Sequence, residues 1–414
     1  MKFFTMTCPL LAVSLAAFAS SVRCQQGGAP AAHAPVLVVA ETLHTMTGPP
    51  RKNAFVLIKN GKISAIGNAA NMPEGLEVTR CKVATPGFLD AHSTVGLTGV
   101  LNVPHDQDQL EKSSPMQPEL RALDAYHPRD PLVEWVRGLG VTTLHTGHGP
   151  GALVSGQTMV IKTHGRSVDQ DVVVPLAMVA VTLADSGRPK GGKGPGTRAK
   201  SVAMLREKLL KAKAYAAKRK RSEDTAIDLG LETLAQVLAG DVPLLITAHR
   251  AHDLASALRV ATEFGIQVVL DGAAESYLML PQLKKAGVWV LPHPAMARTR
   301  GDLENGTMEL AKLLFDAKVP FAIQSGYEAY VPKTRVVLWE AGISVMHGLA
   351  SQDALHALTT SPAKMLGLSD RVGALRVGMD GDLAMFDGDP FEYTTHCLGS
   401  VIDGVKYMGK GDGR

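Results

Sequence analysis

The sequence predicts an α/β protein: a (β/α)8 barrel of the TIM type with a small β-sandwich domain built from both chain ends. The central residues alternate between apolar strand-like runs and helical runs, whereas both ends hold short strands punctuated by Gly and Asp. The 414 residues suffice for one barrel-sized core and a smaller domain. We therefore expect a composite β domain at 35–84 plus 372–414, and a barrel at 85–371.

The two ends of the chain share a β pattern. Asn60-Gly61 separates two apolar runs, 54–58 and 63–66, which is a strong two-residue hairpin signal. Near the other end, the apolar run 382–386 is closed by Asp387-Gly388. We expect these segments to pair in one domain.

The central region supplies the barrel elements. Strands are expected at 141–145, 171–183, 244–249, 266–271, 287–291 and 319–324, and helices at 131–138, 201–219, 229–239, 252–264, 308–316 and 351–366. Asp130-Pro131 is a good helix start, with Asp as the cap and Pro in the first turn. Pro362 interrupts the last helical run, which divides it into two helices. In such barrels function lies at the C-terminal ends of the strands.

The N-terminus has the pattern of a signal peptide over residues 1–19. Lys2 gives a positive start, residues 10–19 are apolar but too short to span a bilayer, and Ala17-Phe18-Ala19 fits a cleavage site. The alternative is a buried N-terminal helix. Residues 20–34 are expected to form a flexible leader. The prediction is a periplasmic or secreted protein with no membrane span.

Charge and cysteines exclude several classes of protein. The net charge of +4 is slight for this length and gives no reason to expect a nucleic-acid partner. Residues 206–221 hold eight Lys or Arg, which indicates a solvated helix face rather than a polyanion site. Of the four cysteines, Cys8 leaves with the signal peptide, and no C-x-x-C pair exists. Cys81 and Cys397 can pair only if the two chain ends meet.

Four stretches together resemble the amidohydrolase superfamily, near its imidazolonepropionase-like and prolidase-like secreted branches. They are Thr85–His92, Ser361–Gly373, Gly378–Asp387 and Val401–Lys406. The resemblance implies a barrel beside a β-sandwich and a hydrolase acting on non-peptide, cyclic or dipeptide-like C–N bonds. It also implies one or two divalent metals, with zinc favoured. A metal activates the attacking water, because it lowers the pKa of its bound water to about 7.

The ligand positions of the family are largely replaced in this chain. The first strand keeps His92 but has Thr94 at the second His position, and the fifth strand has Thr247 with His249 two residues on. Gly272 and Gly326 stand where the sixth strand brings a His and the eighth brings an acid. No Lys is clearly placed for the carboxylated bridging role; Lys162 is the nearest candidate. The ordinary binuclear site cannot be assembled from these positions, since Gly has no side chain and Thr is a poor zinc ligand.

Two hypotheses follow for a small-molecule substrate or ligand. In the first, a rearranged metal site is formed by His92 and His249 with help from His145 or His293, and Asp271 and Glu328 act as acids. In the second, the barrel is a non-catalytic binding protein that has lost the metal site and needs no cofactor. The sequence does not predict the substrate or the oligomeric state.

Overall fold

A computed structural model describes residues 34–101, 103–188, 194–222, 224–327 and 336–409. Within these residues the strands form two seven-stranded sheets. The predicted signal peptide, most of the leader and Glu328 lie outside the described residues. No helix in the described part of the chain is long and apolar enough to cross a membrane.

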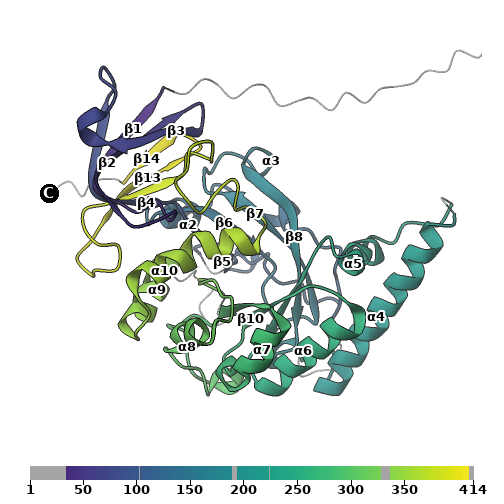
Figure 1. Ribbon diagram of the computed structural model, residues 1–414. Helices are drawn as coiled ribbons and strands as arrows, with labels where there is room; N and C mark the ends of the chain where they lie inside the picture. Colours follow the sequence, from purple (N-terminus) through teal and green to yellow (C-terminus); the bar gives the residue numbers. More distant parts are fainter. Residues whose placement is uncertain (1–33, 102, 189–193, 223, 328–335, 410–414) are drawn as a thin grey trace, which may run out of the picture. The chain divides into compact units, whose positions relative to one another are not determined.

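The first sheet combines strands from both ends of the chain. Its order is β14-β13-β12-β4-β1-β2-β3, and Figure 1 shows the last strands (yellow) beside the first ones (purple). Its strands are β1 (Val36–Leu43), β2 (Arg51–Lys59), β3 (Lys62–Asn68), β4 (Val78–Pro86), β12 (Leu383–Phe386), β13 (Cys397–Ile402) and β14 (Val405–Met408). The Asn60-Gly61 turn joins β2 to β3 as predicted, with both residues at positive φ. Cys81 and Cys397 are both free thiols.

The second sheet is the barrel wall, in the order β11-β10-β9-β8-β7-β6-β5. Its strands are β5 (Phe88–Ser93), β6 (Val141–Gly147), β7 (Val154–Lys162), β8 (Val172–Thr182), β9 (Leu244–Ala248), β10 (Val268–Gly272) and β11 (Trp289–Pro292). Residues 321–326 link its two edges through single bridges, Val290 with Phe321 and Ser93 with Gly326. The predicted α/β barrel with a second sheet is confirmed as a nearly closed barrel.

The barrel departs from a strict series of eight β/α units. Strand β7 runs antiparallel to both β6 and β8. Between β6 and β8 the only helix in the described residues is the four-residue α3 (Val168–Asp171), because hairpin-like connections need no crossover helix. The count of eight β/α units is therefore not confirmed.

The helices other than α3 follow β5 and the strands from β8 onward. They are α1 (Ala122–Ala125), α2 (Pro131–Arg137), α4 (Arg198–Arg219), α5 (Leu229–Ala239), α6 (Ala251–Phe264), α7 (Leu280–Ala286), α8 (Leu310–Ala317), α9 (Val337–Met346), α10 (Ser351–Leu358) and α11 (Thr360–Met365). Asp130 caps α2 by accepting a bond from the Leu132 amide, as predicted. The predicted run is two helices, α10 and α11, but the break falls at Thr359 and Pro362 lies within α11.

A buried lysine joins the barrel to the second sheet. Lys162, at the end of β7, is 2 % exposed and forms ion pairs with Asp380, Asp382 and Asp403, at 3.2 Å for Asp380 and 3.5 Å for Asp403. Burial lowers the pKa of Lys162, but the three carboxylates raise this pKa by more than burial lowers it, so the net shift is upward. His164 adds a 3.1 Å contact to Asp403. Lys162 therefore lies in the joint between the two sheets and serves as its central charge.

We expect Lys162→Met to destabilise the protein by roughly 3–5 kcal/mol, because it leaves the buried Asp382 carboxylate without its cation. The loss should be present at neutral pH and persist into alkali, and it should fade as the pH falls, because burial raises the pKa of Asp382. The pKa of Lys162 is raised, so its contribution is lost only well into alkali, and the pKa of Asp403 is lowered, so its contribution is lost only in acid. Urea unfolding at several pH values measures this. The control is Lys82→Met on an exposed position of β4, which should change stability little; equal effects would refute the role of the joint.

Candidate functional site

A layer of polar side chains lies one pleat above an apolar floor at the C-terminal ends of the strands. The floor includes Leu245, Val269, Leu291 and Ala322, which pack together inside the barrel. Side chains two residues apart on a strand point to the same face. Thr247, Asp271, His293 and Gln324, each two residues beyond a floor residue, are therefore directed toward the barrel mouth.

Asp271 is the centre of this layer. Its side chain accepts hydrogen bonds from Thr247 Oγ1 at 2.6 Å and Gln324 Nε2 at 2.8 Å, and lies 3.4 Å from His92 Nδ1. Thr247 lies opposite Asp271 in the parallel register of β9 and β10, and this register allows the hydrogen bond from Thr247 Oγ1. Burial raises the pKa of Asp271, but the charge of His92 and the hydrogen bonds outweigh it and lower the pKa to about 2. Asp271 is thus ionised and strongly held.

His92 is the second member of the pair and is only 2 % exposed. Burial lowers its pKa, yet the Asp271 carboxylate raises it more, so the net shift is upward. Gln324 also raises this pKa, which places its amide beside the His92 ring. His92 Nε2 and Gln324 Oε1 have no hydrogen-bond partner among the described residues. A buried ring nitrogen and a buried amide oxygen, both without a hydrogen-bond partner among the described residues, therefore lie next to the ionised Asp271.

His145 lies against His92, with 5.6 Å between the ring centroids. Both of its ring nitrogens are engaged, Nδ1 with the Ala91 carbonyl at 2.6 Å and Nε2 with Thr158 Oγ1 at 2.7 Å. Burial, with a smaller contribution from the charge of His92, lowers the pKa of His145 to about 3. His145 is therefore a neutral, hydrogen-bonded ring that supports the site from one side.

His249 and His293 form a separate group beyond β9 and β11. Nδ1 of His249 and Nε2 of His293 have no partner among the described residues. His293 Nδ1 lies 3.0 Å from the Pro294 carbonyl, and burial lowers the pKa of His293 with a smaller contribution from the charge of His249. Gly272 leaves room for His249, because a Cβ there would lie 2.2 Å from His249 Cε1.

The predicted metal ligands do not fit a metal ion in this arrangement. In the described residues no three His, Cys, Asp or Glu side chains gather as a metal-binding group. His145 has no free nitrogen, and Asp271 is already bonded to three side chains. The four predicted histidines divide into His92 with His145, and His249 with His293. A rearranged metal site remains a prediction to which the present donor geometry lends no support.

Two residues of the site were not predicted from the sequence. Gln324 binds Asp271, and Thr158 holds His145. A signal for Gln324 was present, since it stands two residues after Ala322 on the predicted last strand. Thr158 lies on the antiparallel β7, which the alternating pattern did not predict.

The barrel, the second sheet and the polar layer at the strand ends define a fold of the amidohydrolase type. A family model described as the amidohydrolase family matches residues 326–405. An amidohydrolase structure from Thermotoga maritima MSB8 is 29 % identical with a TM-score of 0.85, covering 90 % of this chain and 100 % of that one. A Xaa-Pro dipeptidase structure with bound methionine has a TM-score of 0.58 at 14 % identity, covering 91 % of this chain and 100 % of that one, and shows the fold alone.

Among curated proteins, amidohydrolase tasK of Hapsidospora irregularis is 24 % identical over 389 residues. The match covers 84 % of this chain but 39 % of that protein, so the chain spans about two fifths of the relative's length. The predicted resemblance to the amidohydrolase superfamily is confirmed. Together the comparisons show that the chain is similar to amidohydrolases in sequence and fold.

Substitution of Gly272 tests the packing of the site. Gly272→Ala is strained at φ +79° and pushes its Cβ into His249, whereas Gly265→Ala is strained at φ +65° with nothing within 4 Å. We expect Gly265→Ala to cost about 1 kcal/mol, and Gly272→Ala about 1–3 kcal/mol more. Urea unfolding and the NMR shifts of the His249 ring measure the effect. Equal costs with an unmoved ring would contradict the contact.

Proposed function

We propose that the chain is a hydrolase acting on carbon–nitrogen bonds of a small amide or cyclic amide, with Asp271 and His92 at its reaction centre. The observation that carries the proposal is the pair of unpartnered atoms, His92 Nε2 and Gln324 Oε1, beside the ionised Asp271. An amide presents one acceptor and one donor, the carbonyl oxygen and the N–H. The two groups of the site are the matching donor and acceptor.

The energetics favour such a ligand. A buried polar atom without a partner costs on the order of 1–3 kcal/mol, and a substrate amide that pairs both atoms recovers this cost. The ionised Asp271 accepts a hydrogen bond from Nδ1–H of His92 and thereby orients the ring. With its second nitrogen protonated, His92 donates to the carbonyl oxygen and stabilises the negative charge that develops there.

The metal route is left out of this proposal because the donor set does not fit a metal. In this superfamily a metal would activate water and polarise the carbonyl. Here His92 takes the polarising role, and Thr247 and Gln324 hold Asp271 in place. The predicted periplasmic or secreted location is kept as part of the proposal and rests on the N-terminal sequence.

A non-catalytic binding protein is the second candidate. The observation in its favour is that Thr94, Thr247, Gly272 and Gly326 occupy the positions where the superfamily places metal ligands or the acid. The same unpaired atoms would then hold an amide without cleaving it. Turnover separates the two functions, since both require binding.

We expect His92→Gln to lower kcat by roughly 100-fold on a panel of lactams, cyclic imides and dipeptides, because it removes the polarising donor. Release of the product amine measures the rate, and circular dichroism checks the fold. The matched control is His127→Gln on an exposed ring, which should leave kcat unchanged. Binding without turnover in the unchanged protein would favour the second candidate, and turnover that survives His92→Gln would refute the role of His92.

Removal of metals is expected to leave this activity intact. After dialysis against a chelator, the hydrolysis rate should stay within about two-fold of the untreated rate, because no step uses a metal. Elemental analysis before and after dialysis provides the measurement. Stoichiometric zinc or manganese, whose loss abolishes turnover and whose return restores it, would overturn the metal-free proposal.

A further inference from the structure

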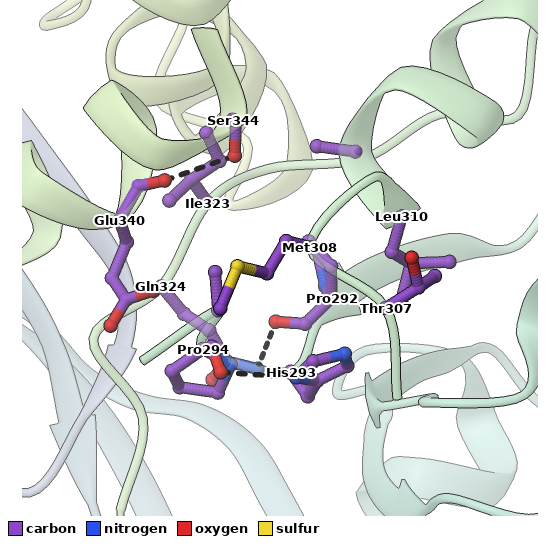
Figure 2. A pocket seen from close by; sticks show the side chains of 12 residues that line it. Pro292, His293, Pro294, Thr307, Met308, Leu310, Ile323, Gln324, Glu340 and Ser344 are labelled. Atoms are coloured by element: carbon purple, nitrogen blue, oxygen red, sulfur yellow. Dashed lines mark hydrogen bonds between the residues drawn. The ribbon is translucent and has the colours of Figure 1, made fainter. Parts of the chain in front are cut away.

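The closing segment of the barrel, residues 321–326, links β11 to β5. On the β11 side, Gln324 Nε2 donates hydrogen bonds to the Leu291 and Pro292 carbonyls, both at 3.2 Å. Figure 2 shows Gln324 and Pro292 among the side chains at the end of β11. The same amide donates to Asp271, so the placement of the closing segment determines where Gln324 lies in the reaction centre.

On the β5 side, a carboxyl side chain supplements the backbone pairing. The Gly326 amide donates to the His92 carbonyl at 3.0 Å. The amide of the preceding residue, Ser325, donates to Oδ1 of Asp90 at 2.9 Å. The same oxygen lies 3.4 Å from the His92 amide. One oxygen of Asp90 therefore contacts a backbone amide of β5 and a backbone amide of the closing segment.

The bonds of Asp90 do not depend on its charge. Asp90 is 2 % exposed, and burial raises the pKa of its carboxyl to about 6, while hydrogen bonds from the hydroxyl and the amide of Ser325 oppose this rise. Both the acid and the carboxylate keep an oxygen that can accept from a backbone amide. Without that oxygen the buried Ser325 amide would lose its acceptor, which is costly in a protein interior.

We propose that Asp90 is a positioning residue that sets the spacing between His92 and Gln324. It does so by holding the Ser325 amide, which follows Gln324 directly in the closing segment. The inference rests on the proposed function, in which His92 and Gln324 bind the two ends of one substrate amide. A shift of about 1 Å between such groups is enough to slow a reaction roughly 100-fold.

Two substitutions of Asp90 test the role of its acceptor oxygen. Asp90→Ala removes this oxygen. We expect kcat for amide hydrolysis to fall at least about 30-fold while KM changes less than about three-fold, because the bond from His92 to the carbonyl oxygen is strongest in the transition state. Asp90→Asn keeps an acceptor for the Ser325 amide, so its kcat should stay within about three-fold of the rate of the unchanged protein.

The matched control is Asp130→Ala. Asp130 is 4 % exposed, and its side chain also accepts a hydrogen bond from a backbone amide, that of Leu132 at 2.7 Å. This bond caps α2 and joins neither β5 nor the closing segment. Asp130→Ala should lower stability in urea but leave kcat unchanged. The NMR signals of the His92 ring and the Gln324 side-chain amide should shift in Asp90→Ala and stay in place in Asp130→Ala.

Hydrogen exchange in the unchanged protein keeps the proposal falsifiable even if Asp90→Ala does not fold. The Ser325 amide should exchange at least about 100-fold more slowly than an unprotected amide, because its hydrogen bond must open first. Rapid exchange of this amide would overturn the proposal.

The outcomes separate the positioning role from the proposed function. Equal losses of kcat in Asp90→Ala and Asp130→Ala, or in Asp90→Ala and Asp90→Asn, would overturn positioning by the acceptor oxygen. Turnover that is insensitive to Asp90→Ala would overturn the inference and leave the proposed function standing. Absence of turnover in the unchanged protein would remove the proposed function. The NMR signals would then test the positioning alone: signals that move only in Asp90→Ala support it, and signals that stay in place overturn it.

Discussion

The barrel mouth is organised around one buried carboxylate, Asp271. An ionised acid that is 4 % exposed must be neutralised or hydrogen-bonded, because removing it from water unpaired costs far more than a protein can tolerate. In this chain His92, Thr247 and Gln324 supply the charge and the bonds. These partners come from β5, β9 and the 321–326 segment. The need to pair the buried Asp271 carboxylate therefore links three parts of the barrel.

A second buried charge holds the other end of the barrel wall. Lys162 closes β7 and meets carboxylates that flank β12 and the turn between β13 and β14. The barrel and the composite sheet are thereby fixed to each other by ion pairs that are screened from solvent. Lys162 pairs with Thr143 near the start of β6, so it lies toward the opposite end of the barrel wall from the strand ends that carry the polar layer.

The sequence was sufficient for the architecture because the architecture depends on periodicity and turn chemistry. The Asn60-Gly61 hairpin and the Asp130 cap are local signals, and each appears in the structure where the residues indicated. The last helical run is divided as predicted, but at Thr359 and not at Pro362. The reversal of β7 was not predictable, since an apolar strand reads alike in either direction. Residues of the site were partly predictable: strand ends located His92 and Asp271, but the bonds between them depend on register across the barrel.

The replaced positions are physically consistent with one another. Thr247 donates a hydrogen bond to Asp271, and a histidine at 247 would present a ring in place of this short hydroxyl contact. Gly272 makes room for the His249 ring. The absence of a side chain at this position of β10 therefore allows His249, which follows β9, to pack there. Gly326, at φ +66°, pairs with Ser93 at the closure of the barrel. Each of these residues thus supports a bond or a contact of the observed network, and that network is built on Asp271.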